Sequence, residues 1–211
     1  MEFETLVQTR RSVCGYKNEP VPRALIDEVL SVAKGAPSSM NTQLWHVHVL
    51  TGAPLDEVRR RNMEGMASGE KPKRDILTHG AYEGEHRRRQ VDIGKKLFSA
   101  MGIERHDAER RQDWVLRGFR QFDAPVSIIL TYDRVLDPGA PCHFDLRALA
   151  YGIVLAAWDR GLGAVTNGQG ISRSDIVREV AQIPDDDFAA NTVKSDRDPN
   201  ESFVRYVGFE D

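Results

Sequence analysis

Val126-Ser127-Ile128-Ile129-Leu130-Thr131-Tyr132 is the stretch of the sequence that decides the fold. Its unbroken run of apolar and β-branched residues predicts a central strand that is buried on both faces. A second strand is predicted from Trp45 to Leu50, where Trp45, Val47 and Val49 alternate with a chemically different set of side chains. The two segments together predict a sheet as the centre of the molecule.

Helical patterns flank these strands. The predicted helices are a short one through Phe3, Leu6 and Val7, one through Ile26, Val29, Leu30 and Ala33, one from His143 to Arg160, and one from a Ser172/Asp175 capping box to about Gln182. The helix at 143–160 is apolar on most sides, which is typical of a helix in a core or at a subunit interface. The tail, Phe203–Phe209, reads as a further strand. We therefore expect one α+β domain over residues 1–211, with a mixed sheet surrounded by helices.

Composition limits the classes of function. The chain has 211 residues, 40% hydrophobic and 29% charged, and a net charge of −3. This balance excludes a disordered chain and disfavours a nucleic-acid partner. The most apolar segment, Ala148–Trp158, is too short to span a bilayer, which needs about 20 residues. The N-terminus lacks the pattern of a secretory signal and Cys14 and Cys142 are the two cysteines, so we expect a cytoplasmic protein without a membrane partner.

The region 55–121 is rich in charge and helical in pattern. A solvated helical face is its simplest interpretation, and an RNA- or membrane-binding patch at its arginine runs is the least favoured. Glycines at 65, 69, 80 and 84 punctuate the segment, which also fits a cover over a binding site.

The common catalytic patterns are missing from the sequence: it has no G-x-S-x-G, H-E-x-x-H, C-x-x-C, P-loop or G-x-G-x-x-G motif. His46 and His48 share a strand face but have no evident third ligand, so no metal site is predicted. Cys142, His143 and Asp145 are too close in sequence to face one another as a nucleophile and its base.

What remains is a scattered set of groups that suit an anionic, planar ligand. Arg10-Arg11-Ser12 offers two guanidinium groups and a hydroxyl, and Lys194 and Arg197 add two cations. The segment 37–43 supplies hydroxyls and amides, although it also suits an ordinary turn. The glycines of Asn167-Gly168-Gln169-Gly170 allow a ligand to approach the backbone closely.

Taken in order, these segments carry a resemblance. The motifs are Arg10-Arg11-Ser12, Pro37-Ser38-Ser39-x-Asn41-x-Gln43-x-Trp45, Gly161-Leu162-Gly163 ahead of Asn167-Gly168-Gln169-Gly170, Asn191-Thr192-Val193-Lys194-x-x-Arg197, and Val207-Gly208-Phe209. From Arg10 to Phe209 the chain resembles the FMN-dependent nitroreductase family, in its branch that reduces nitroaromatic compounds.

The resemblance implies a homodimer with FMN in each of two sites at the dimer interface. It also implies a ping-pong oxidoreductase that takes two electrons from NAD(P)H and passes them to a nitroaromatic or similar planar acceptor. No catalytic side chain is assigned, because the flavin N5 carries the chemistry. The implied cofactor-binding residues are Arg10, Arg11, Ser12, Ser38, Ser39, Asn41, Gln43, Thr166, Asn167, Gly168, Lys194 and Arg197. Trp114, Phe119 and Phe122 in the cover region are candidates to stack on the substrate, or they pack the cover onto the core.

The chain departs from the resembled pattern near residues 187–188, where one family strand is expected to be missing. We expect the tail strand to repair part of the sheet, either from its own chain or exchanged between subunits. Three alternatives to a nitroreductase stay open: a reductive dehalogenase or other flavin chemistry on the same fold, a catalytically impaired flavin-binding dimer, and a structural domain without a ligand.

Overall fold

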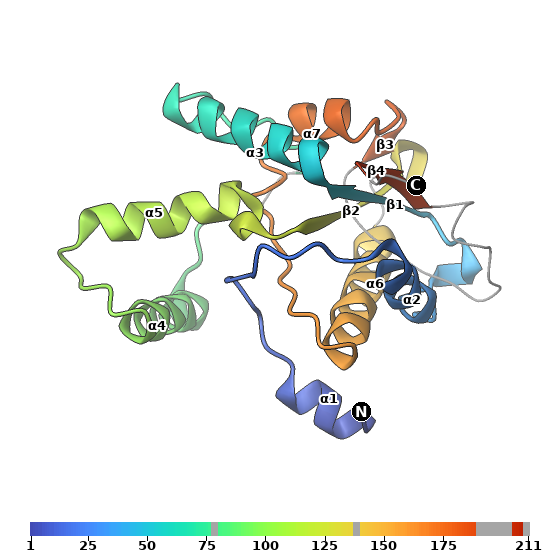
Figure 1. Cartoon of the computed structure of the whole chain (residues 1–211), viewed down its shortest axis with the longest axis horizontal. Coiled ribbons are helices and arrows are strands. Elements are labelled where there is room, and N and C mark those ends of the chain that lie inside the picture. Colours follow the sequence, from blue (N-terminus) through green and yellow to red (C-terminus); the bar gives the residue numbers. More distant parts are fainter. Residues whose placement is uncertain (77–79, 137–139, 189–203, 209–211) are drawn as a thin grey trace.

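The structure is a computed structural model that describes residues 1–76, 80–136, 140–188 and 204–208 (Figure 1). Its α-helices are α1 (Phe3–Thr9), α2 (Arg23–Ala33), α3 (Gly52–Ala67), α4 (Gly84–Ala100), α5 (Ala108–Phe119), α6 (Ala140–Asp159) and α7 (Ser174–Val180). Its strands are β1 (Trp45–Thr51), β2 (Val126–Asp133), β3 (Asp187–Phe188) and β4 (Val204–Val207). The short 3-10 helices are η1 (Ser39–Asn41), η2 (Gln121–Asp123) and η3 (Arg134–Leu136).

The strands form a sheet in the order β3-β2-β1-β4. β1 pairs antiparallel with β2 over its whole length, and β2 pairs antiparallel with the two residues of β3. β4 joins the other edge in parallel with β1 of the same chain, so the tail does extend the sheet. The predicted mixed sheet is confirmed, with the tail strand described over Val204–Val207. Near 187–188, where a family strand is expected to be missing, the structure has the two-residue strand β3.

Helices cover both faces of this sheet, as Figure 1 shows: α2 and α6 lie on one side, and α3 and α7 on the other. Trp45, Val47 and Val49 pack into the core that α2 and α6 complete. Leu50 and Ile129 face the opposite core, with α3 and α7. The alternation read from β1 therefore corresponds to two separate cores, because successive side chains of a strand point to opposite faces.

The helix α6 is the longest element that supports the sheet. It begins three residues before the predicted start and packs along α2, where a Cβ on Gly152 would lie 3.1 Å from the Ala33 carbonyl oxygen. A glycine therefore lets the two backbones approach closely. Within the described residues, no helix combines the length and the apolar character that a membrane crossing requires.

The region 55–121 contains most of α3 and the whole of α4 and α5, which confirms its helical character. In Figure 1, α4 and α5 extend away from the sheet as an arm, and α4 has no buried residue. Whether this arm covers a site in a partner stays a prediction at this point.

Candidate functional site

The N-terminal arm that follows α1 lies against the segment that follows α6. Ser12 forms a parallel bridge with Ala164, and the Val13 N–H donates to the Ala164 carbonyl at 3.2 Å. Gly163 makes the contact possible, because a Cβ there would lie 2.8 Å from the Val13 side chain. Ser12 and Val13 of the arm are thus placed beside Ala164, although about 150 residues separate them in sequence.

Arg10 has a buried hydrogen-bond donor with no acceptor. Its Nη1 donates to the Ser12 hydroxyl at 3.4 Å, but its Nε is buried and has no hydrogen-bond partner within the described structure. A buried guanidinium N–H without an acceptor costs about 1–3 kcal/mol, so such groups are usually paired. An acceptor oxygen of a ligand would remove this cost.

Arg11 points elsewhere. Its guanidinium donates to the carbonyl oxygens of Gln8 at 2.8 Å and Arg10 at 3.0 Å, so it closes the C-terminal end of α1. Of the two adjacent arginines, Arg10 is therefore the one with a buried Nε that lacks a partner in the described structure.

The segment Thr166–Gly168 is held from two sides. Asn167 donates from its side-chain amide to the Gly118 carbonyl in α5 at 2.7 Å. The Gly168 carbonyl accepts from Arg74 at 2.9 Å. These bonds engage the Asn167 side chain and the Gly168 carbonyl within the protein and fix the position of the segment.

The turn at 38–43 is a second polar element. The Gln43 N–H donates to the Ser38 hydroxyl at 3.3 Å, and the Gln43 side chain donates to the Asn41 side chain at 3.0 Å. Met40, Asn41 and Gln43 have φ of 50°, 57° and 43°. Non-glycine residues in this left-handed region are uncommon and strained, and they concentrate at binding sites. The Ser39 N–H donates to the buried Asp145 carboxylate of α6 at 2.8 Å, which anchors the turn.

One chain does not bring all the predicted residues together. Ser12 bridges Ala164, two residues before Thr166, whereas the light-blue η1 lies beyond α2 and α6, on another side of the molecule (Figure 1). Lys194 and Arg197 fall outside the described residues. A complete site would therefore need the turn of a second subunit.

The three aromatic candidates lie at the end of α5 and in η2. The rings of Trp114 and Phe122 are tilted with centroids 5.8 Å apart, and the Arg117 guanidinium stacks 5.3 Å from the Trp114 centroid. Phe122 is buried, so it packs within the protein, while Trp114 and Phe119 are half-buried. Since Gly118 holds Asn167, this aromatic group adjoins the segment 166–168. Contact with a substrate stays a prediction for all three residues.

The side chains of Cys142, His143 and Asp145 form hydrogen bonds that stabilise the fold. His143 Nε2 lies 3.0 Å from the Tyr132 hydroxyl, the Cys142 thiol donates to the Leu136 carbonyl, and Asp145 holds Ser39. These partners point in different directions, so no nucleophile and base are formed among them.

Two buried amides were not predicted from the sequence. Asn62 in α3 donates to the carbonyls of Phe119 and Gly170, and Gln121 donates to the same Gly170 carbonyl at 3.2 Å. They join α3, η2 and the segment after Gly168. Asn62 could have been found, because it follows Leu55 and Val58 at helical spacing on the buried face of α3.

The structure is an α+β protein in which the arm with Arg10 and Ser12 bridges the segment after α6 at Ala164. Residues 7–191 match the family model described as the nitroreductase family. The chain belongs to the nitroreductase family.

Relatives and solved structures agree with this assignment. The chain is 34% identical to a chloronitrobenzene nitroreductase of Comamonas testosteroni over 187 residues, which is 87% of this chain and 81% of the relative. It is 26% identical to a 4-nitrobenzoate reductase of Pseudomonas putida, over 99% of this chain and 97% of the relative. In fold it is similar to the FMN- and NADPH-dependent nitroreductase NfnB of a Sphigopyxis strain, with a TM-score of 0.81, 22% identity, and coverage of 99% of this chain and 100% of that one.

Proposed function

We propose that the protein is an FMN-dependent oxidoreductase that transfers two electrons from NAD(P)H to a nitroaromatic or similar planar acceptor. The observation that carries the proposal is the buried, unpaired Nε of Arg10, whose Nη1 bonds to Ser12, in the arm that bridges Ala164. The names of the relatives, which include reductases of nitrobenzenes and 4-nitrobenzoate, support the choice of acceptor.

The residues present fit FMN. Its phosphate and the carbonyls of its pyrimidine edge are acceptors, which suit the donors of Arg10 and Ser12. The backbone of Thr166–Gly168 would supply N–H donors, and the turn would add hydroxyls and amides from Ser38, Ser39, Asn41 and Gln43. Lys194 and Arg197 are kept as candidates for the phosphate.

Each part of this site has a physical task. FMN bound here would supply the two-electron redox chemistry between NAD(P)H and the acceptor. Arg10 places a permanent positive charge where negative charge develops, and the restrained backbone of 166–168 adds fixed N–H dipoles without reorganisation. Trp114 and Phe119 offer ring faces that can stack on a planar substrate.

We propose a homodimer, because the two halves of the site lie apart in one chain. The surface supports this. Phe144 of α6 is 78% exposed and Phe3 of α1 is 70% exposed, which is unusual for large apolar side chains unless a partner covers them. In this arrangement the arm formed by α4 and α5 would cover the partner's site. A single-domain organisation and a cytoplasmic location also stay predictions.

Absorbance spectroscopy tests the proposal. The purified protein should show flavin bands, and NADH or NADPH added without oxygen should bleach them. A nitrobenzoate or a chloronitrobenzene should then restore the colour. Protein that carries no flavin after incubation with FMN, or bound flavin that neither nucleotide bleaches, would contradict the proposed function.

A further inference from the structure

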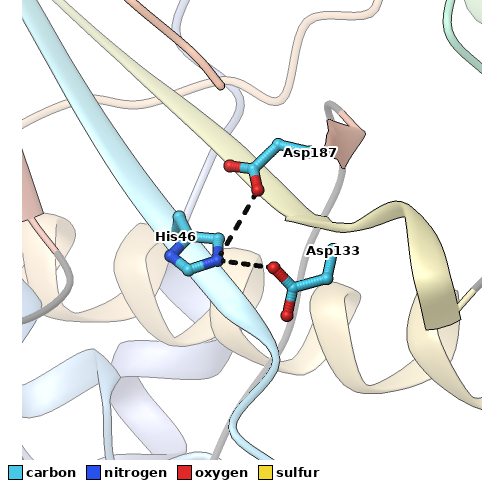
Figure 2. A group of neighbouring side chains, drawn as sticks. All are labelled: His46, Asp133 and Asp187. Atoms are coloured by element: carbon cyan, nitrogen blue, oxygen red, sulfur yellow. Dashed lines mark hydrogen bonds and ion pairs between the residues drawn. The ribbon is translucent and has the colours of Figure 1, made fainter. Parts of the chain in front are cut away.

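Three side chains from three strands meet at the β3 edge of the sheet, and none of them belongs to the proposed flavin-binding set. His46 of β1, Asp133 of β2 and Asp187 of β3 point toward one another in Figure 2. His46 Nε2 lies 3.2 Å from Asp133 Oδ1 and 3.7 Å from Asp187 Oδ1, and the three ligand atoms lie within 4.8 Å of one another.

The two carboxylates are in an unfavourable position on their own. Asp133 and Asp187 are directly opposite in the antiparallel β2·β3 ladder, where like charges destabilise the pairing. The Asp187 side chain is only 5% exposed, and a buried carboxylate is costly unless its charge is balanced. The cluster therefore needs positive charge.

No lysine or arginine within the described ranges forms an ion pair with the Asp187 carboxylate. Arg178 is close, but its Nη1 donates to the Asp187 backbone carbonyl at 2.6 Å. The ion pairs recorded for Asp187 run to His46 and His48, and imidazoles carry a full charge only when protonated. A cation held between the side chains would supply the missing charge.

Neighbouring groups fix the direction of Asp187. The Thr131 hydroxyl donates to Asp187 Oδ2 at 2.7 Å, and the buried His48 Nε2 lies 3.1 Å from the same hydroxyl. Since the hydroxyl proton is used toward the carboxylate, His48 donates to Thr131. This chain of bonds leaves Asp187 Oδ1 facing His46, as hydrogen bonds behind metal ligands commonly do.

We propose that His46, Asp133 and Asp187 bind a divalent transition-metal ion of the Zn²⁺ type, which fastens the short strand β3 to β1 and β2. At metal–ligand distances of about 2.0–2.2 Å, ligand atoms around one tetrahedral ion lie about 3.3–3.6 Å apart. The separations from His46 Nε2 come close to this spacing. One imidazole and two carboxylates suit Zn²⁺ and leave a fourth position for water, and the half-exposed His46 and Asp133 give the ion a path from solvent.

The test is a calorimetric titration with ZnCl₂. It uses tag-free protein, both as purified and after treatment with a chelator. One ion per chain should bind. The midpoint of thermal unfolding should rise by about 5–10 °C at a free concentration of 100 times Kd. Asp133→Asn and His46→Gln should each weaken Zn²⁺ binding at least 10-fold. Loss of a group that only hydrogen-bonds to a metal ligand already lowers metal affinity by about 10-fold or more. His86→Gln, on the exposed surface of α4, is the matched histidine control and should bind like the wild type.

The behaviour of Asp133→Asn without metal separates the proposal from a protonated His46 that merely bridges the carboxylates. If the site is built for a cation, this variant relieves the charge repulsion, so its metal-free melting point should equal or exceed that of the wild type, while its Zn²⁺ response is lost. A wild type that ignores Zn²⁺, or variants that respond as fully as His86→Gln, would overturn the proposal. Neither result depends on flavin or turnover, so failure here leaves the proposed function standing.

Discussion

Replacing Arg10 with glutamine should weaken FMN binding without destabilising the flavin-free protein. In the structure the guanidinium has one bond of 3.4 Å to Ser12 and a buried Nε without an acceptor. Glutamine keeps much of the side-chain length and removes both the charge and the unpaired donor. The substitution should therefore lower the affinity for FMN without lowering the stability of the flavin-free protein.

The magnitude follows from the bonds involved. A hydrogen bond to a charged group contributes about 1.5–3 kcal/mol, which corresponds to a Kd for FMN that rises about 10- to 150-fold. In the flavin-free protein, the buried unpaired donor costs about 1–3 kcal/mol, so its removal should leave the free energy of unfolding unchanged or increase it.

Fluorescence titration with FMN gives the Kd, and urea unfolding of the flavin-free protein gives its stability. Arg60→Gln is the matched control, because Arg60 is exposed on α3, outside the proposed site, and pairs with Glu57 and Glu64. Equal Kd values for Arg10→Gln and Arg60→Gln would refute the role of Arg10. A large loss of stability in the flavin-free Arg10→Gln protein would show instead that Arg10 serves the fold.

Three further predictions concern the fold that carries the site. Leu55→Ala, at a side chain with 0% exposure, should lower the free energy of unfolding by about 2–5 kcal/mol in urea, and a loss below 1 kcal/mol would contradict the second core. Gly163→Ala places a Cβ 2.8 Å from Val13, so overpacking should cost roughly 1–3 kcal/mol and weaken FMN binding as the arm shifts; unchanged melting and Kd would contradict this contact. The pKa of Asp175 is lowered from 3.8 to about 2, first by its hydrogen bonds from Arg173. A lowered folded-state pKa gives stability that is complete above the unfolded value and is lost as the pH falls toward 2, so Asp175→Asn should lose less stability than the wild type between pH 4 and pH 2, with a small difference because solvent screens the pair.

The sequence was most informative where a periodic pattern reports burial. The run at 126–132 and the alternation at 45–50 gave β2 and β1, since both faces of this sheet are covered and each face selects apolar side chains. Local polar signals were less reliable. The capping box at Ser172 and Asp175 was wrong: α7 begins at Ser174, and Asp175 accepts from the Arg173 guanidinium and not from a cap. Ser172 is buried instead, where its carbonyl accepts from the Lys73 backbone.

Long-range contacts set the limit of prediction for the site. The resemblance gave the residues around Arg10 and Thr166, but the bridge from Ser12 to Ala164 and the hydrogen bond from Arg74 to Gly168 depend on tertiary placement. The cluster at His46 lacked a third ligand in the sequence for the same reason. Asp133 and Asp187 reach it only through the pairing of β2 with β3, which no local pattern specifies.

A flavin site shared by two subunits can be tested by mixing two defective proteins. Arg10→Glu damages the arm, and Ser39→Glu damages the turn, where the Ser39 side chain is exposed. Refolding or coexpressing the two variants together yields heterodimers in which one site carries both changes and the other carries neither. If the site is shared, about a quarter of the wild-type flavin content and NAD(P)H-dependent bleaching should return in the mixture. If both segments bind FMN within one chain, every site in the mixture stays damaged and no flavin returns.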